Sequence, residues 1–277
     1  MNYRHAFHAG NFADCFKHAL LLHLIAALQG KQGGLTVLDT HAGAGAYDLG
    51  ADPALRTGEA RHGIFRLLDD PPAALADYVG LVRSLGLYPG SPLLARARLR
   101  AQDRLVCCEL HPADHAALRA RFAGDPLVAV HRRDAWEALG ALLPPRATRR
   151  ALVLIDPPYE APDEFAQLAD GLARAAAKFP TGVFAAWYPI KHLAPVREFH
   201  AAVAGGVRRP VLAAALTLRA PLDPAHLNGC GLLVVNPPFR FAEATQPLLS
   251  ALLARLADGE AGGEAGAGAG VARIAGP

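Results

Sequence analysis

Residues 152–161 read LVLIDPPYEA, an apolar run that passes directly into an acid, two prolines and an aromatic residue. An uninterrupted apolar run of this kind predicts a strand that is buried on both faces. The two prolines after Asp156 remove two successive backbone N–H donors and stiffen the turn. A second copy of the pattern, LLVVNPPF at residues 232–239, has Asn236 in place of the acid. One copy is therefore a candidate active site, and the other is a candidate for a simple strand end.

Strand-length apolar segments recur along the chain and alternate with helical segments, which is typical of a doubly wound α/β sheet. Ahead of the first strand, a helix is expected to start at the cap formed by Asn11 and to stop at Gly30. Residues 46–100 show helical periodicity and turns but little strand signal, so a helical insertion is expected there. The strands are expected at Leu35–Asp39, Leu105–Leu110, Leu127–His131, Ala151–Ile155, Val183–Trp187, Val211–Leu218 and Gly231–Val235.

Composition limits the class of protein. The chain has 277 residues, of which 52% are hydrophobic, and this is enough for one large α/β domain in residues 1–258. Residues 259–277 consist mainly of glycine and alanine and are expected to form a disordered tail. No apolar run reaches the roughly 18 residues that cross a bilayer, and the N-terminus lacks a secretory signal pattern. The four cysteines show no metal or redox spacing, which favours a reducing cytoplasm.

Four of the expected strands end in groups suited to ligand binding, because open α/β sheets bind ligands beyond the carboxyl ends of their strands. The first ends in Asp39 and leads to a glycine turn at residues 43–45, where missing side chains let a ligand approach the backbone. Glu109 ends the second and is placed to accept two hydrogen bonds from a ribose diol. Asp134 and Asp156 follow the third and fourth strands. A dinucleotide fingerprint would need a third glycine and a nearby acid, and their absence disfavours NAD.

This series of strand ends resembles the S-adenosylmethionine-dependent methyltransferases, and Asp-Pro-Pro-Tyr resembles those that methylate exocyclic amines, above all N6 of adenine. The adenine amino lone pair is delocalised into the ring, which makes the nitrogen a poor nucleophile. Two acceptors aimed at its hydrogens, the Asp156 carboxylate and the Pro157 carbonyl, would favour a pyramidal nitrogen and restore the lone pair for attack on the sulfonium methyl. Tyr159 offers a face on which the extruded base can stack.

Further motifs make the resemblance closer, and together they are similar to the bacterial 23S ribosomal RNA adenine-N6-methyltransferase J family over nearly the whole chain except the tail. The resemblance implies a Rossmann-like methyltransferase sheet, S-adenosyl-L-methionine as cofactor and 23S rRNA as partner. The motifs are YRHAFHAGNFADCFKH at residues 3–18, DTHAGAG at 39–45, RTGE at 56–59, YPGSP at 88–92, ELHP at 109–112 and WYP at 187–189.

The resemblance also implies roles for individual residues. Asp156 corresponds to the catalytic acceptor and Tyr3 to a substrate-contacting tyrosine ahead of the first helix, while Lys17 is a further candidate for a substrate contact. Ala135 lies where the family often has glycine, a small departure that leaves a backbone contact possible. The residues expected to bind the cofactor are His18, His41, Ser91, Glu109, Asp134, Ala135 and Asp156.

Some of these residues also have a structural interpretation. Ser91 is a good helix N-cap, with Pro92 at the first helical position, and it can serve in both ways. His18 taken alone is a polar residue on a core helix, and Tyr3 taken alone belongs to a frayed terminus. Asn236 follows the last expected strand, far from the nucleotide end of the sheet, and is interpreted as structural.

Two alternatives to this function differ in substrate or in class. A DNA adenine-N6 methyltransferase would use the same chemistry, but no separate DNA-reading domain is visible in the sequence. A non-catalytic RNA-binding module on a decayed methyltransferase fold is disfavoured by the intact Asp156-Pro-Pro-Tyr motif and glycine turn. His5 and His8 have no carboxylate or cysteine at metal-binding spacing, so no metal is expected. The protein is expected to be a cytoplasmic monomer with no membrane partner.

Overall fold

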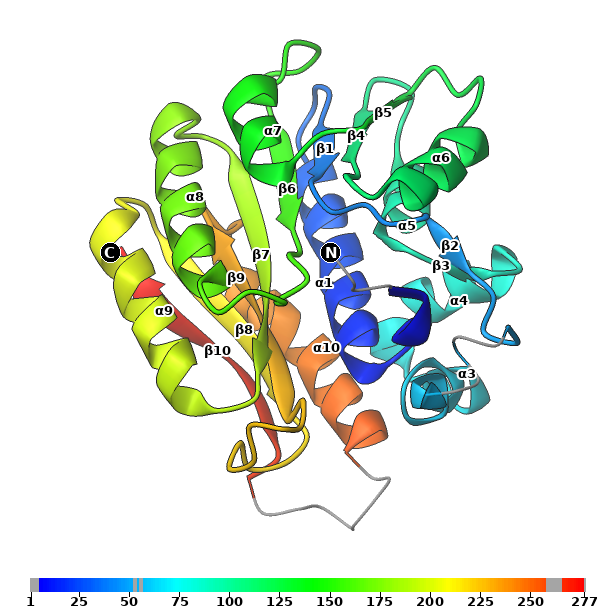
Figure 1. Cartoon of the computed structure of the whole chain (residues 1–277), viewed down its shortest axis with the longest axis vertical. Helices are drawn as coiled ribbons and strands as arrows, with labels where there is room; N and C mark the ends of the chain where they lie inside the picture. The colour runs from blue at the N-terminus through cyan, green and yellow to red at the C-terminus, as the bar shows by residue number, and fades with distance from the viewer. Residues whose placement is uncertain (1–4, 52–53, 55–56, 258–265, 277) are drawn as a thin grey trace.

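The fold is a central eight-stranded sheet with helices on both faces, and Figure 1 shows this arrangement in the computed structural model. The structure describes residues 5–51, 54, 57–257 and 266–276. Across the sheet the strand order is β10-β8-β9-β7-β6-β1-β4-β5. The strands are β1 (Thr36–Asp39), β4 (Arg104–Cys108), β5 (Val128–His131), β6 (Ala151–Ile155), β7 (Val183–Ile190), β8 (Val211–Thr217), β9 (Gly229–Val235) and β10 (Gly268–Ala275).

The strands from β5 to β7 run parallel, whereas β9 lies antiparallel between β7 and β8. Since β8 is antiparallel to β9, it points the same way as β7 and β6 and ends at the same edge of the sheet. The doubly wound α/β sheet predicted from the sequence is therefore confirmed. All seven expected strands are present, with ends shifted by a few residues, and β10 is an additional strand that the sequence did not predict.

The two faces of the sheet carry separate hydrophobic cores because successive side chains of a strand point to opposite faces. In β6, Leu152 and Leu154 belong to one core, while Val153 and Ile155 belong to the other. Helices α1 (Phe12–Gln29), α5 (Ser91–Arg98), α6 (Pro112–Arg121) and α10 (Phe241–Leu256) contribute to the first core. Helices α7 (Ala135–Leu142), α8 (Glu164–Lys178) and α9 (Leu193–Gly206) cover the second.

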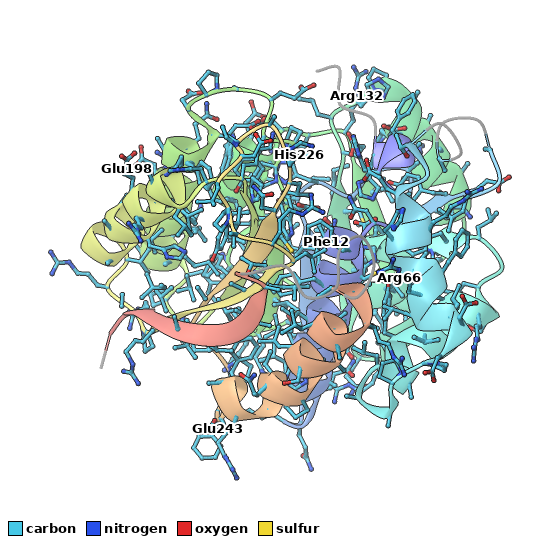
Figure 2. The ribbon with its side chains drawn as sticks, turned by 90° about the horizontal axis from the view of Figure 1, so that it is seen from below. Phe12, Arg66, Arg132, Glu198, His226 and Glu243 are labelled. Atoms are coloured by element: carbon cyan, nitrogen blue, oxygen red, sulfur yellow. The ribbon has the colours of Figure 1, made fainter. Side chains whose placement is uncertain are left out.

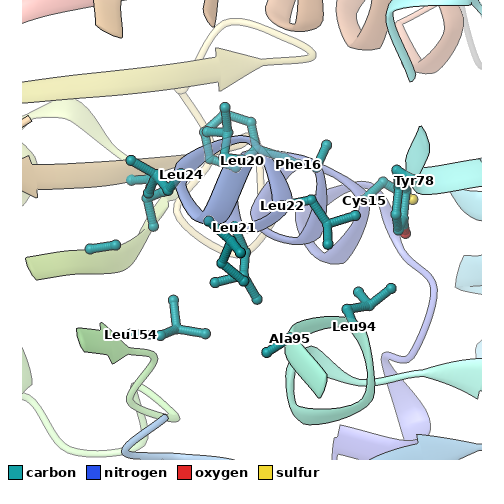
Figure 3. Packing of buried hydrophobic residues seen from close by; sticks show 14 of the residues in the cluster. Cys15, Phe16, Leu20, Leu21, Leu22, Leu24, Tyr78, Leu94, Ala95 and Leu154 are labelled. Carbon is teal, nitrogen blue, oxygen red and sulfur yellow. The ribbon is translucent and has the colours of Figure 1, made fainter. Parts of the chain in front are cut away.

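Helix α1 runs through the middle of the first core. Its N-cap is Asn11, whose side chain accepts a hydrogen bond from the backbone N–H of Asp14 at 2.9 Å, and its C-cap is Gly30, as predicted. Figure 3 shows the helix surrounded by side chains from other elements, among them Tyr78 and Leu94. A helix that is buried on most sides tolerates polar residues only where they have partners. The polar side chains of its first two turns therefore need partners, and the active site provides them.

The predicted insertion between β1 and β4 is mainly helical. It also holds a short antiparallel pair, β2 (Ala46–Tyr47) with β3 (Tyr88–Pro89), which the sequence did not predict because each strand has only two residues. This pair closes the insertion onto the sheet edge. The remaining elements are the 3₁₀ turns η1 (His5–Phe7), η2 (Glu59–His62) and η3 (Ala73–Leu75), and the helices α3 (Ile64–Asp69) and α4 (Ala76–Ser84).

The expectation of a disordered tail is wrong for residues 268–275, which form β10; residues 258–265 lie outside the described part of the chain. β10 pairs antiparallel with β8, from Gly268 opposite Thr217 to Ala275 opposite Val211. A strand at a sheet edge gains its ladder of backbone hydrogen bonds whatever its side chains, so a glycine- and alanine-rich composition does not prevent pairing. The sequence signal for this strand is the pair of β-branched residues Val271 and Ile274, because β-branched residues favour strands.

Candidate active site

Acidic residues follow neighbouring parallel strands at one edge of the sheet. β1 pairs with β4 on one side and with β6 on the other, so Asp39, Glu109 and Asp156 leave the sheet at the same edge. Asp134 comes after β5, which is the next strand beyond β4. Ligands of doubly wound sheets bind at this edge. The topology therefore places all four predicted carboxylates around one possible site.

A small cavity of about 100 Å³ opens at this edge, and the glycine turn forms part of its wall. The seven residues expected to bind the cofactor all line this cavity: His18, His41, Ser91, Glu109, Asp134, Ala135 and Asp156. The fold thus brings together residues from α1, the insertion and four different strand ends.

Glu109 is held by two backbone N–H groups. Gly43 donates to its Oε2 at 2.8 Å, and His111 donates to its Oε1 at 2.7 Å. Gly43 has a φ of +60°, and a Cβ at this position would lie 2.3 Å from the Tyr47 hydroxyl, so the turn requires glycine here. Each carboxylate oxygen keeps a second lone pair, and the pair of oxygens can accept two hydroxyl donors such as those of a ribose.

Ser91 donates a hydrogen bond from its Oγ to Oδ2 of Asp39 at 2.6 Å. The interpretation of Ser91 as a helix N-cap is wrong, because Gly90 is the N-cap of α5 and Ser91 is its first residue. The Ser91 hydroxyl bonds to the buried carboxyl of Asp39 instead of capping the helix. Burial raises the pKa of Asp39 to about 6, although the hydrogen bond from Ser91 opposes this shift. Asp39 was noted as a strand end but not predicted as a site residue, and nothing local in the sequence indicates its contact with Ser91.

Asp134 caps helix α7. Its Oδ1 accepts hydrogen bonds from the backbone N–H groups of Trp136 at 2.9 Å and Glu137 at 3.1 Å. This cap fixes Ala135, the first residue of the helix, in the wall of the cavity. Asp134 therefore has a structural role that the sequence did not reveal, and a cap of this kind still leaves the second carboxylate oxygen facing outward from the helix end.

His41 connects the glycine turn to the Asp156 turn. Its Nδ1 lies 3.2 Å from the backbone nitrogen of Asp156 and 2.9 Å from Oγ1 of Thr40. Burial lowers the pKa of His41 to about 4, so the imidazole is neutral at pH 7. A neutral ring can accept the N–H of Asp156, and this contact holds the catalytic candidate at a defined position relative to the cofactor cavity.

Lys17 forms an ion pair with Asp156, the predicted catalytic residue. Its Nζ lies 2.6 Å from Oδ2 of Asp156 and 3.0 Å from Oδ1 of Asp14. The Lys17 side chain is only 7% exposed, so its ammonium bridges two carboxylates inside the protein rather than extending to solvent. The sequence predicted Lys17 as a candidate substrate contact, but its bond to Asp156 was not foreseen.

Asp14 anchors this buried group of charges. Its Oδ2 accepts a hydrogen bond from the backbone N–H of Gly10 at 3.0 Å and lies 2.9 Å from Nε2 of His5. Burial alone would raise the pKa of Asp14, but His5, Lys17 and His18 together hold it well below its usual value. Asp14 is therefore ionised at neutral pH. Its spacing of three residues from Lys17 on one helix was the signal available in the sequence.

His18 lines the smaller cavity and belongs to a buried chain of polar groups. Its Nδ1 lies 3.1 Å from the hydroxyl of Tyr88, and this hydroxyl lies 3.0 Å from that of Tyr78. Burial lowers the pKa of His18 to about 3, so the ring is neutral at pH 7. A neutral imidazole can hydrogen-bond to a ligand without adding charge to the cavity wall.

A second, larger cavity of about 740 Å³ lies on the other side of Asp156 and is lined by the whole Asp-Pro-Pro-Tyr turn. Tyr159 has a φ of +54° and donates its hydroxyl to the Trp187 carbonyl at 2.9 Å. Its ring also packs against Phe165 and Trp187, which gives it a fixed orientation in the cavity wall. Four residues line both cavities: His5, Lys17, Asp156 and Pro158. The two cavities therefore meet at the candidate catalytic carboxylate.

The second Pro-Pro motif lies elsewhere. β9 is antiparallel to β7, with Val235 opposite Phe184, so Asn236 leaves the sheet at the edge opposite Asp156. Its amide nitrogen donates to the carbonyls of Pro180 at 3.0 Å and Gly182 at 2.7 Å. The contacts agree with the structural interpretation of Asn236. Tyr3, the other predicted substrate contact, lies outside the described residues.

Metal-binding clusters and membrane-spanning helices are both absent from the part of the chain that the structure describes. Within those residues, no cluster of three or more histidine, cysteine, aspartate or glutamate side chains could hold a metal ion. No helix among them is long and apolar enough to cross a membrane.

Comparisons with known proteins agree on one family. The family described as "Ribosomal RNA large subunit methyltransferase D, RlmJ" matches residues 32–266. A protein from Escherichia coli (strain K12) named "Ribosomal RNA large subunit methyltransferase J" is 40% identical over 265 residues, which cover 92% of this chain and 94% of that protein. A protein of the same name from Haemophilus influenzae is 37% identical over 266 residues, with the same shares of both chains.

The fold has a close counterpart among solved structures. The crystal structure of protein LPL1258 from Legionella pneumophila str. Philadelphia 1 superposes with a TM-score of 0.85 and 32% sequence identity. The alignment covers 96% of this chain and 98% of that one. The similarity thus extends over the sheet, the insertion and the helices on both faces.

Proposed function

The chain belongs to the ribosomal RNA large subunit methyltransferase J family, and from this membership we propose that it methylates the N6 amine of an adenosine in 23S rRNA with S-adenosyl-L-methionine as methyl donor. The observation that carries the proposal is the position of Asp156-Pro-Pro-Tyr159 between two cavities that share the Asp156 side chain. Methyl transfer needs a donor and an acceptor on opposite sides of one short gap. Two cavities that meet at one carboxylate have the required layout.

We assign S-adenosyl-L-methionine to the smaller cavity on the chemistry of the residues that line it. Both oxygens of Glu109 are oriented by backbone N–H groups and can accept the ribose hydroxyls, while Ala135 at the start of α7 can contact the adenine. The glycine turn leaves room for the ligand where a Cβ would collide with Tyr47. His18 and His41 line the same cavity as neutral hydrogen-bonding groups. When bound, the sulfonium group supplies an activated methyl group.

The chain's own residues prepare the acceptor. The Asp156 carboxylate and the Pro157 carbonyl would accept the two hydrogens of the adenine amine and favour the pyramidal nitrogen that attacks the methyl group. Lys17 forms an ion pair with the Asp156 side chain, and the neutral His41 accepts a hydrogen bond from the Asp156 backbone N–H. Both contacts fix the position of Asp156. The proton that leaves the methylated amine is placed on Asp156. Because these groups are already fixed, little reorganisation accompanies the reaction.

The larger cavity would receive the adenosine once it is extruded from its stack. Tyr159 contributes an aromatic ring to its wall, and unstacked bases bind on aromatic side chains. We also retain Tyr3 as a residue that contacts the target adenosine, which follows from its place in the N-terminal motif and awaits a Tyr3→Ala variant assayed for RNA methylation.

The two Pro-Pro motifs of the chain offer a matched test of this function. Asp156→Ala should retain cofactor binding within a few-fold in a calorimetric titration but lose most single-turnover methylation of 23S rRNA that lacks the modification. Asn236→Ala removes the same kind of side chain at the opposite edge of the sheet, and its folded fraction should keep full activity. Near-normal turnover by Asp156→Ala would refute the assignment, and loss of turnover in folded Asn236→Ala would transfer it to the other motif.

A further inference from the structure

The larger cavity is wider than one adenine requires. Its volume of about 740 Å³ lies toward the upper end of the range for pockets that take drug-sized molecules, roughly 300–1,000 Å³. Its walls come from distant parts of the chain, and Figure 2 shows Phe12 of α1, Arg66 of α3 and His226 of the segment between β8 and β9 around the same side of the molecule. The Asp-Pro-Pro-Tyr turn occupies only one part of this lining, so the rest is available to more of the substrate.

Successive strands place basic residues at the edge where Asp156 lies. β6, β7 and β8 all point the same way, and the residues just beyond them are Asp156, Lys191 and Arg219, respectively. β9 lies between β7 and β8, so Lys191 is one strand and Arg219 three strands across the sheet from Asp156. Ile155 is opposite Ala186, so Lys191 also lies four residues, or roughly 13 Å, farther along the strand direction than Asp156. All three residues line the larger cavity. The cations therefore lie in a row that leads away from the candidate catalytic carboxylate.

A third cation faces this row from the insertion. Arg66 of α3 lines the same cavity and is placed by contacts with the Leu256 carbonyl at 3.4 Å and with Nδ1 of His62 at 3.3 Å. The contact with Leu256 ties α3 to the end of α10, so the Arg66 guanidinium belongs to a fixed wall. Arginine is well suited to phosphate because its planar fork can donate two parallel hydrogen bonds.

The acidic residues of the cavity come from other elements than Lys191, Arg219 and Arg66, and most of them are already paired. Asp14 and Asp156 share the Lys17 ammonium, and Glu59 is bonded to Nδ1 of His8 and to the Asn11 amide, each at 2.9 Å. Glu160, next to the Asp-Pro-Pro-Tyr turn, is the fourth carboxylate in the lining. All four belong to the N-terminal helix region, to η2 or to the catalytic turn. The ends of β7 and β8 and helix α3 contribute only cations among the charged residues of the lining, and an RNA backbone requires positive charge.

We propose that this part of the larger cavity binds the phosphodiester backbone of the nucleotides that flank the target adenosine, with Lys191, Arg219 and Arg66 as the phosphate-contacting residues. The inference rests on the proposed function, because it takes Asp156 as the point where the adenosine is held. It specifies the substrate as a short single-stranded segment of RNA that lies along the ends of β6, β7 and β8. The target base is bound at Asp156, and the backbone that continues from it is bound by the row of cations.

The salt dependence of RNA binding tests the proposal. The probe is a fluorescein-labelled nine-nucleotide single-stranded RNA with one central adenosine, titrated by fluorescence anisotropy at several salt concentrations. For single-stranded RNA, the slope of log K against log salt is about −0.7 for each phosphate contact, so removing one contact makes the slope shallower by about 0.7. Lys191→Gln, Arg219→Gln and Arg66→Gln should each lower the slope by about 0.7 and weaken binding roughly tenfold at low salt. The triple variant should lower the slope by about 2.

Matched controls separate a phosphate contact from a folding defect. Arg174→Gln removes an exposed arginine of α8 that lines neither cavity, and it should leave the slope unchanged. Arg66→Lys and Arg219→Lys keep the charge and should restore most of the slope. Melting temperature and cofactor affinity are measured on every variant, and binding of adenosine 5′-monophosphate should stay within two- to threefold of wild type because the mononucleotide does not reach the row.

Each outcome has a definite meaning. An unchanged slope in the three glutamine variants, or an equal loss in Arg174→Gln, overturns the proposal. So does an equal loss of affinity for the mononucleotide and the RNA, since the residues would then act on the adenosine site itself. Reduced slopes in a protein that transfers no methyl group to any RNA would support the backbone site and refute the proposed function instead.

Discussion

At the scale of single residues, the candidate active site contains carboxylates whose surroundings are quite different. His5, Lys17 and His18 hold the pKa of the buried Asp14 carboxyl well below the usual value, whereas burial raises the pKa of Asp39 to about 6. Glu109 is oriented by two backbone N–H groups. The surroundings of each acid therefore differ, since Asp14 pairs with Lys17, Asp39 accepts a hydrogen bond from Ser91, and Glu109 keeps lone pairs that ligand hydroxyls can use under the proposed function.

The ion pair between Asp14 and Lys17 should be measurable in stability. Asp14→Asn and Lys17→Met each remove one partner from a buried pair, so each should destabilise the protein. Because the two side chains lie 3.0 Å apart, the double variant should lose less than the sum, with a coupling energy of roughly 0.5–3 kcal/mol. Urea unfolding of the four proteins at pH 7 gives this energy. Strict additivity would show that the pair contributes nothing to the fold.

Glu109→Gln should weaken cofactor binding. The amide keeps one oxygen that can accept from Gly43 or His111, but it loses the second acceptor and the charge. A hydrogen bond to a charged group contributes about 1.5–3 kcal/mol, so the affinity should fall by at least roughly tenfold. Isothermal titration with S-adenosyl-L-methionine measures it. Glu137→Gln, an exposed change on α7, is the control, and equal affinities for the two variants would place the ribose elsewhere.

At the scale of elements, β10 covers the edge of the sheet that β8 would otherwise expose. It pairs with β8 along seven registered positions and packs against α9 and α10. Without it, β8 would present unpaired backbone groups and apolar side chains such as Leu216 at the edge of the sheet. Unprotected edge strands of this type promote pairing with other chains. The glycine- and alanine-rich end of the chain therefore protects the fold.

Removal of residues 266–277 should lower the melting temperature and increase light scattering on heating. The cofactor cavity should be unaffected, since β9 and β7 separate β8 from β6. Differential scanning calorimetry and a cofactor titration on the truncated protein check both statements. A truncated chain that melts at the wild-type temperature without aggregation would show that β10 has no protective role.

At the scale of the whole molecule, buried histidines dominate the expected response to acid. Burial lowers the pKa of five histidines, to about 3 for His18 and about 4 for His41: His18, His23, His41, His131 and His200. The unfolded chain would protonate these rings near pH 6.5. Three groups act in the opposite direction, because burial raises the pKa of Asp39 to about 6 and that of Glu164 to about 7, and the hydrogen bond to Glu59 raises the pKa of His8.

The free energy of unfolding should therefore decrease between pH 6.5 and pH 4. In this window the unfolded chain binds more protons at the histidines than the folded chain does, so stability decreases as the pH falls. Asp39, Glu164 and His8 bind their protons more readily in the folded chain and offset part of this loss. Urea titrations at pH 7, 6 and 5 test the sign. Greater stability at pH 5 than at pH 7 would mean that Asp39, Glu164 and His8 outweigh the five histidines whose pKa is lowered.

The sequence by itself determined the elements and the strand ends. Apolar runs of strand length, the Asn11 cap and the polar residues that follow each strand are patterns within a few neighbouring residues, and such local patterns decide backbone conformation. The rule that ligands bind at the carboxyl ends of parallel strands then grouped Asp39, Glu109, Asp134 and Asp156 from the sequence alone. The family motifs added His18, His41 and Ser91, which all line the same cavity.

Only the tertiary structure decided which side chains meet. Lys17 and Asp156 are 139 residues apart, and Ser91 and Asp39 are 52 apart, so neither bond leaves a trace in the local sequence pattern. The pairing of β10 with β8 depends on an open sheet edge rather than on the composition of β10, which is why the tail was misjudged. The row of Lys191 and Arg219 arises from the direction of β8, and this direction is fixed by the antiparallel strand β9 beside it. Contacts between distant segments are determined by the packing of the whole chain, and for this reason the partners of the site residues could not be predicted from the residues themselves.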